Sequence, residues 1–139
     1  MQTKDTTLSE KSLASSQLAL KKAYLLLEQG DIQDAMDCAE EAITLAPNHP
    51  TPYLVHANIL CAVGFVQESM TRLQRARKKW PQSTLAHLYF AEACILLSRI
   101  PQAKRALHKA QRSDKNQEHR EYCNTLSSLV DMAMEGEMS

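Results

Sequence analysis

The sequence predicts an all-α fold in which pairs of helices repeat along the chain and one further helix closes the array. The first observation behind this prediction is a set of similar residues that recur every 34 positions: Ala23, Ala57 and Ala91; Ala42, Ala76 and Ala110; Gly30 and Gly64; Pro47 and Pro81; Ile32, Val66 and Ile100. The second is that each period holds two helical patterns with a turn between them. A fixed period of this size is typical of helical repeat proteins.

The first pair of helices should occupy residues 16–49, after a polar segment over residues 1–8 that we expect to be disordered. The first helix could start at Ser9 with Ser12, or at Thr7 with Glu10, which have the spacing of a capping box, and it should run to about residue 29. Gly30 can adopt the left-handed conformation that ends a helix. The second helix is expected over residues 32–46, and Pro47 cannot continue it.

The second and third pairs should occupy residues 50–83 and 84–117. Thr51 and Pro52 form a typical helix start, and Gly64 should end that helix before another over residues 66–79. In the third pair the turn falls at Ser98, where serine replaces the glycine of the earlier repeats and specifies the turn less sharply.

A final helix is predicted over residues 117–134, and residues 135–139 should fray. Its apolar residues share one helical face: Tyr122, Leu126, Leu129, Val130 and Ala133. An array of stacked repeats needs such a helix to cover the apolar face of its last repeat. The helical domain is therefore expected to span residues 9–134.

Composition places the chain among single-domain proteins, with 139 residues, 44% hydrophobic residues and a net charge of zero. No stretch is long and apolar enough to cross a membrane, and the first residues lack the apolar core of a secretory signal, so we expect a cytoplasmic protein.

The charges are unevenly spread: residues 1–49 and 118–139 each carry a net charge of −4, and residues 50–83 and 84–117 each carry +4. Solvated helix faces explain this pattern, and head-to-tail self-association is an alternative. The basic segment lacks interleaved aromatic residues, which argues against nucleic-acid binding.

No catalytic or metal-binding motif is evident. The four cysteines, Cys38, Cys61, Cys94 and Cys123, are too far apart for a CxxC motif and should be reduced residues on apolar helix faces. His56 and His87 could approach each other, but two histidines without a nearby carboxylate or thiol make a poor metal site. There is no phosphate-binding glycine loop and no nucleophile elbow. We therefore expect neither an enzyme nor a cofactor.

Residues 16–117 resemble the tetratricopeptide repeat, a helix-turn-helix unit of this period. The resemblance implies a right-handed α-solenoid of three helix pairs whose first helices line a concave groove. The groove positions of that family fall here on Leu20, Tyr24, Leu27, Leu54, Asn58, Cys61, Leu85, Leu88, Glu92 and Ile95. The same positions also include Gln17, Glu28, Thr51, Ala62 and Leu96.

The groove residues separate two functions known in that family. Members that bind the acidic tail of heat-shock chaperones use a clamp of lysine, asparagine and arginine, and the matching positions here hold Leu20, Tyr24, Val55, Leu85 and Tyr89. None of these can pair with a carboxylate by charge. The mostly apolar groove favours a non-catalytic chaperone or adaptor that holds an apolar helix or extended segment of a partner protein.

The layout also resembles the tetratricopeptide chaperones of bacterial type III secretion, which hold a hydrophobic substrate before export. That resemblance depends on three repeats followed by Glu118-His119 at the start of the closing helix, and on the segment Ala91 to Cys94. The alternative function is a structural scaffold that self-associates through its acidic ends and basic middle. A homodimer is compatible with both interpretations.

Overall fold

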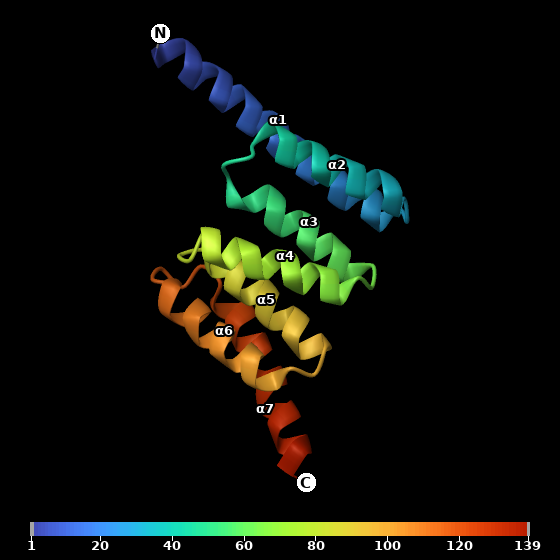
Figure 1. Ribbon diagram of the computed structural model, residues 1–139, viewed down its shortest axis with the longest axis vertical. Helices are drawn as coiled ribbons and strands as arrows, with labels where there is room; N and C mark the ends of the chain where they lie inside the picture. Colours follow the sequence, from blue (N-terminus) through green and yellow to red (C-terminus); the bar gives the residue numbers. More distant parts are fainter. Residues whose placement is uncertain (1, 139) are drawn as a thin grey trace.

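The computed structural model describes residues 2–138 and consists of stacked helices (Figure 1). No strand occurs within this range. The helices are α1 (Gln2–Glu28), α2 (Ile32–Leu45), α3 (Pro50–Ala62), α4 (Val66–Lys79), α5 (Thr84–Leu96), α6 (Ile100–Ser113) and α7 (Arg120–Met138). The predicted all-α fold of stacked helices is confirmed.

The three turns within the pairs have one conformation because they satisfy the ends of α1, α3 and α5 in the same way. Gly30, Gly64 and Ser98 have positive φ angles of 84°, 103° and 59°. After α3, the Gly64 amide donates to the Cys61 carbonyl and the Phe65 amide donates to the Leu60 carbonyl. This pair of bonds is the Schellman arrangement, and it recurs after α1 and α5. The turns therefore lie where the 34-residue period predicts them.

Small residues allow the helices to pack closely. Ala57 and Ala91 are buried, as the repeat pattern predicts, and so are Ala35, Ala39, Ala42 and Ala103. Two buried serines link helices within a pair, since Ser16 Oγ donates to the Ala42 carbonyl at 2.8 Å and Ser69 Oγ donates to the Ala57 carbonyl at 2.6 Å. All four cysteines are free thiols, as expected.

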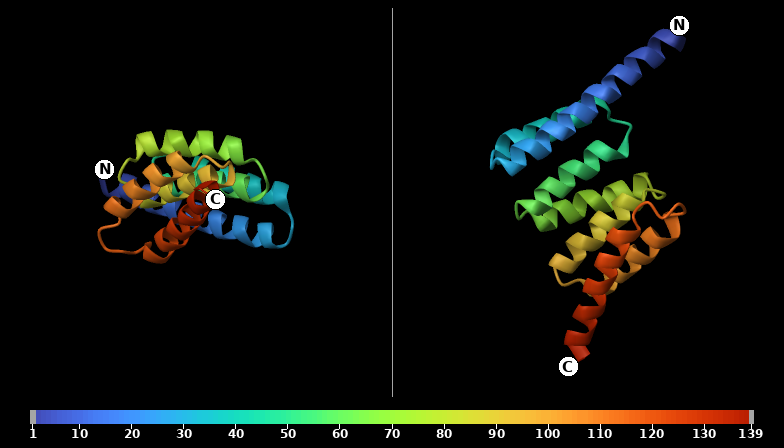
Figure 2. Two further views of the ribbon diagram at one scale, coloured as in Figure 1. Left: turned by 90° about the horizontal axis from the view of Figure 1, so that it is seen from below. Right: turned by 180° about the vertical axis from the view of Figure 1, so that it is seen from behind.

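Both ends differ from the sequence-based expectation. α1 begins at Gln2, so residues 2–8 are helical where we expected disorder; no glycine or proline interrupts this segment. At the other end, α7 begins at Arg120, because Gln117 has a φ of 56° and the Asp114 carboxylate accepts a hydrogen bond from the His119 amide. α7 then continues through residues 135–138, which we expected to fray. Both terminal helices extend beyond the stacked body (Figures 1 and 2), and the expectations for Met1 and Ser139 lie outside the described residues.

Candidate binding surface

The odd-numbered helices form one layer of the array and the even-numbered helices form the other. α1 contacts α3, α3 contacts α5 and α5 contacts α7, whereas no Cα atom of α2 lies within 8 Å of α4, nor any of α4 within 8 Å of α6. A layer whose helices touch is shorter than a layer whose helices are spaced apart. The odd-numbered helices therefore lie on the concave side of a curved stack.

The ten groove residues predicted from the sequence fall into two groups, one buried and one accessible to solvent. Leu54 and Leu88 are only 2% and 0% exposed, and Leu20 is also buried, so all three side chains pack between helices. Of the other seven, Tyr24 is 37% exposed and the rest are half-buried: Leu27, Asn58, Cys61, Leu85, Glu92 and Ile95. Leu20, Leu54 and Leu88 therefore pack inside the array, whereas the seven others keep part of their side chains accessible to solvent.

A hydrogen-bonded group of aromatic residues joins α5 to α7 on this layer. Tyr122 donates its hydroxyl to Oε2 of Glu92 at 2.6 Å, and its ring lies 6.1 Å from that of Tyr89, measured between centroids. Tyr122 was not among the predicted groove residues, and Tyr89 was named only as a position that matches the heat-shock clamp. Tyr122 follows Leu88 by one full period, so extending the 34-residue repeat into the last helix would have identified its position.

Burial keeps the hydroxyl and thiol groups of this layer neutral. Burial, and then the hydrogen bond to Glu92, raise the pKa of the Tyr122 hydroxyl well above its ordinary value. Burial, and then the neighbouring Tyr24 hydroxyl, raise the pKa of Tyr89 in the same way. The pKa of the Cys61 thiol is raised by burial and then by the charge of Glu92. The layer therefore holds uncharged hydroxyl and thiol groups and the partly buried Glu92 carboxylate beside apolar side chains.

A cavity of about 390 Å³ lies at one edge of the concave layer. Leu54 and Leu85 line it together with the first residues of α3 and α5 and the loop between α6 and α7. Leu96, at the opposite end of α5, is 59% exposed. Apolar surface is thus available near both ends of α5.

The histidines do not form a metal site with each other. His56 faces Glu40 and Arg72, whereas His87 contacts Arg77 and the Pro81 carbonyl. Within residues 2–138 no three His, Cys, Asp or Glu side chains lie together so that they could hold a metal ion. In the same range, no helix combines the length and the hydropathy required to cross a bilayer.

Solved structures with this arrangement of helices include tetratricopeptide repeat domains. No family model matches the sequence, and no curated protein matches it. The TPR2B domain of yeast Sti1, solved as a complex with pHsp70, has 20% sequence identity and a TM-score of 0.74, over 86% of this chain and 98% of that one. The Yersinia enterocolitica type III secretion translocator chaperone SycD, in an alternative dimer, has 15% identity and a TM-score of 0.77, over 91% and 96%.

SycD has also been solved with a peptide of the translocator YopD, and that structure has 16% identity and a TM-score of 0.73, over 87% of this chain and 93% of that one. At these identities the likeness establishes the fold. The chain therefore has the tetratricopeptide repeat fold, shared with a domain of a yeast protein and with a bacterial chaperone.

Proposed function

We propose that this chain is a non-catalytic protein-binding module, a chaperone or adaptor that holds an apolar helix or extended segment of a partner on its concave layer. The observation that supports this most directly is the composition of that layer. Tyr24, Leu27 and Ile95 offer apolar surface, and Asn58 and Glu92 provide hydrogen-bonding groups among them. Such a surface suits a segment with a few apolar anchors.

The neutral tyrosines on this layer favour an apolar ligand over an acidic one. Tyr89 and Tyr122 carry no charge, the one hydroxyl proton of Tyr122 is already donated to Glu92, and the Glu92 carboxylate would repel a second carboxylate. Two of the similar solved structures are described as complexes with pHsp70 and with a YopD peptide, which supports peptide binding as the general activity. A secretion-system chaperone is the more specific form of this proposal, and the likeness to SycD supports it.

A photo-crosslinking experiment tests where the partner binds. A photoreactive phenylalanine analogue would replace Tyr24 or Leu96 on the concave layer, and Gln102 on α6 as an outer-layer control. The chain would be expressed in its native cells, irradiated, and crosslinked proteins identified by mass spectrometry. We expect one partner at both concave positions and none at Gln102.

Charge substitutions then measure the contribution of the surface to affinity for the identified partner. The Tyr24→Glu/Leu96→Glu variant should bind at least tenfold more weakly, about 1.4 kcal/mol, because it sets unpaired charges against an apolar ligand. The charge-matched control, Gln102→Glu/Gln111→Glu on α6, should bind as the parent does. Equal loss of binding in both variants, or a protein that only crosslinks to itself, would favour the self-associating scaffold.

A further inference from the structure

We propose that the gap between α2 and α4, on the outer layer, is a second binding site, and that it takes a carboxylate side chain within an acidic segment of a partner protein. The site is on the opposite side of the array from the concave surface.

The gap is a formed cavity. α2 and α4 do not contact each other, and α3 lies beneath them as a floor. The resulting cavity has a volume of about 230 Å³ and is lined by Ile43, Tyr53, His56, Arg72, Arg75, Ala76, Lys79 and Trp80. Its size suits one or two side chains of a peptide.

The charge of the lining selects an anion. Three cations and no carboxylate line the cavity. Among the described residues, Arg75 and Lys79 form no ion pair with an acidic side chain, and both are exposed. Guanidinium and ammonium groups that are free to pair recognise carboxylates through charge-assisted hydrogen bonds.

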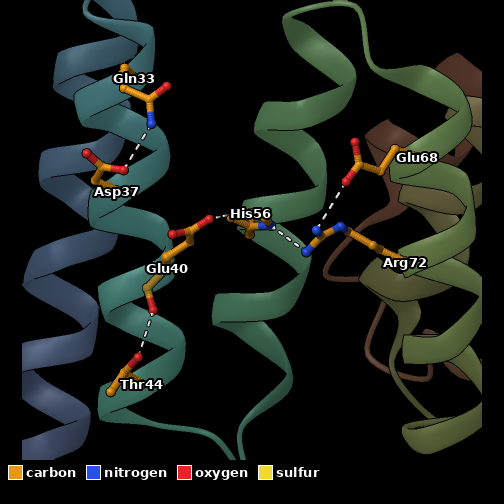
Figure 3. Close-up of polar contacts among 7 residues, drawn as sticks. All are labelled: Gln33, Asp37, Glu40, Thr44, His56, Glu68 and Arg72. Atoms are coloured by element: carbon orange, nitrogen blue, oxygen red, sulfur yellow. Dashed lines mark hydrogen bonds and ion pairs between the residues drawn. The ribbon is translucent and has the colours of Figure 1, made fainter.

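The third cation is held in place by neighbours on two helices (Figure 3). Arg72 donates to Oε1 of Glu68 at 3.1 Å and to Nδ1 of His56 at 3.3 Å. Because a guanidinium has five N–H groups, these two bonds leave Arg72 further donors. A side chain that is already ordered loses less entropy when a ligand binds.

His56 provides independent evidence that a hydrogen-bond acceptor is missing from this gap. The residue is only 2% exposed, and its Nε2 has no hydrogen-bond partner within the described part of the chain. The nearest carboxylate oxygen, Oε1 of Glu40, is 3.7 Å away, which is too far for a hydrogen bond. A buried polar atom without a partner is costly, and a ligand that moves Glu40 or brings its own acceptor would remove that cost.

The next repeat differs at the position that corresponds to Ile43. Arg77 stands 34 residues after Ile43 and therefore has the corresponding position in the next repeat. Its guanidinium lies 4.2 Å from the centre of the Phe90 ring and donates from Nε to Nδ1 of His87 at 3.0 Å. The shorter Ile43 leaves the first gap open, and the cations around it favour an occupant of opposite charge.

An aromatic wall completes the site beside the cations. The rings of Tyr53 and Trp80 lie 5.3 Å apart, and the Lys79 ammonium group lies 4.8 Å from the centre of the Trp80 ring. Tyr53 is held further by a hydrogen bond from its hydroxyl to the Pro47 carbonyl. This aromatic wall suits an apolar side chain that is next to the carboxylate residue in the partner's segment.

Trp80 allows a direct test because it is the only tryptophan of the chain. The probe is a capped hexapeptide of alternating glutamate and leucine, titrated into the full-length protein while tryptophan fluorescence is recorded. We expect a saturable change with the acidic peptide. The same peptide with glutamine in place of glutamate, and inorganic phosphate at equal ionic strength, should give none.

Substitutions on the two outer helices locate the site. Arg75→Gln/Lys79→Gln should weaken peptide binding at least tenfold, whereas the matched loss of charge on α6, Arg105→Gln/Lys109→Gln, should not. All four side chains are exposed, so unfolding curves should be unchanged. The Tyr24→Glu/Leu96→Glu variant should bind the peptide normally, which separates this site from the concave surface. A response to phosphate or to the neutral peptide, or equal weakening by both pairs of glutamines, would overturn the proposal.

Discussion

At the scale of single residues, two buried histidines link the outer helices to the inner ones as neutral groups. His56 accepts from Arg72 at Nδ1, and His87 accepts from Arg77 at Nδ1 and donates from Nε2 to the Pro81 carbonyl. Burial is the main reason that the pKa of each histidine lies below its ordinary value, and the nearby arginine lowers it further. Glu40 and Glu68 near His56, and the Pro81 carbonyl at His87, oppose this shift without reversing it.

This arrangement predicts that the fold loses stability in mild acid. Above the ordinary histidine pKa of about 6.5 both forms of the chain hold neutral histidines, and the full stability is present. As the pH falls below that value the unfolded chain binds protons that the folded chain does not, so the free energy of unfolding decreases by at most about 1.4 kcal/mol per pH unit for each histidine. Urea unfolding between pH 7.5 and 5.5 measures the slope.

Variants separate the buried histidines from other titrating groups. His56→Gln/His87→Gln should flatten the dependence on pH, even if it lowers stability at every pH. The exposed His108 serves as the matched control, and His108→Gln should keep the slope of the parent. A double variant with an unchanged slope would show that carboxylates cause the acid sensitivity.

At the scale of helices, the three turns share one geometry although their sequences differ. Ser98 has a φ of 59° at the place where the other pairs have Gly30 and Gly64. The left-handed region costs a residue with a side chain roughly 1–2 kcal/mol, and glycine avoids this cost. The packing of α5 against α6 and the hydrogen bonds of the turn therefore hold Ser98 in a conformation that it does not itself favour.

Ser98→Gly is therefore expected to raise the free energy of unfolding by about 0.5–1 kcal/mol, since glycine also loses more entropy on folding. The reverse change, Gly64→Ser, should lower it by a similar amount. A β-carbon at Gly64 would meet no atom within 4 Å, so its cost arises from the backbone alone. Thermal unfolding followed by circular dichroism compares the two, and a destabilised Ser98→Gly protein would contradict the argument.

These elements were predictable from the sequence to different degrees. The 34-residue period fixes the turns at Gly30, Gly64 and Ser98 because a repeated glycine and repeated alanines mark the same places in each pair. The pattern of apolar residues cannot separate a leucine that lies between helices from one that faces a ligand. Leu54 and Leu88 were therefore predicted as groove contacts, although both are buried.

The gap between α2 and α4 could not be predicted from the sequence for another reason. It depends on the distance between α2 and α4 and on the length of one side chain, that of Ile43. The basic residues on α4 were evident, but their proximity to Tyr53 and Trp80 requires the packed structure. Solvated helix faces therefore explained those charges equally well before the fold was known.

At the scale of the whole molecule, the array is stabilised by two apolar clusters that meet at α3. The larger cluster includes Leu73, Leu88 and Leu107 and extends to Cys123, Leu126 and Val130 of α7. The smaller one joins α1 and α2 to Val55 and Ile59. Stacked repeats share stability through the interfaces between neighbours, so the loss of one end affects the adjoining pair first.

Deletion of residues 118–139 should therefore destabilise the C-terminal part of the array more than the N-terminal part. The deletion removes Cys123 and also Leu126 and Val130, which are each worth about 1.5–3 kcal/mol when fully buried, and it exposes the apolar residues of α5 and α6 that they cover. We expect a lower melting temperature and aggregation on heating. Amide hydrogen exchange should accelerate in α5 and α6 and change little in α1 and α2.

A deletion of residues 2–8, which removes only the first turns of α1, is the control and should leave the melting temperature close to that of the parent. If the truncated protein melts like the full chain, α7 is an appended helix and the stability of the last pair comes from α5 and α6 alone.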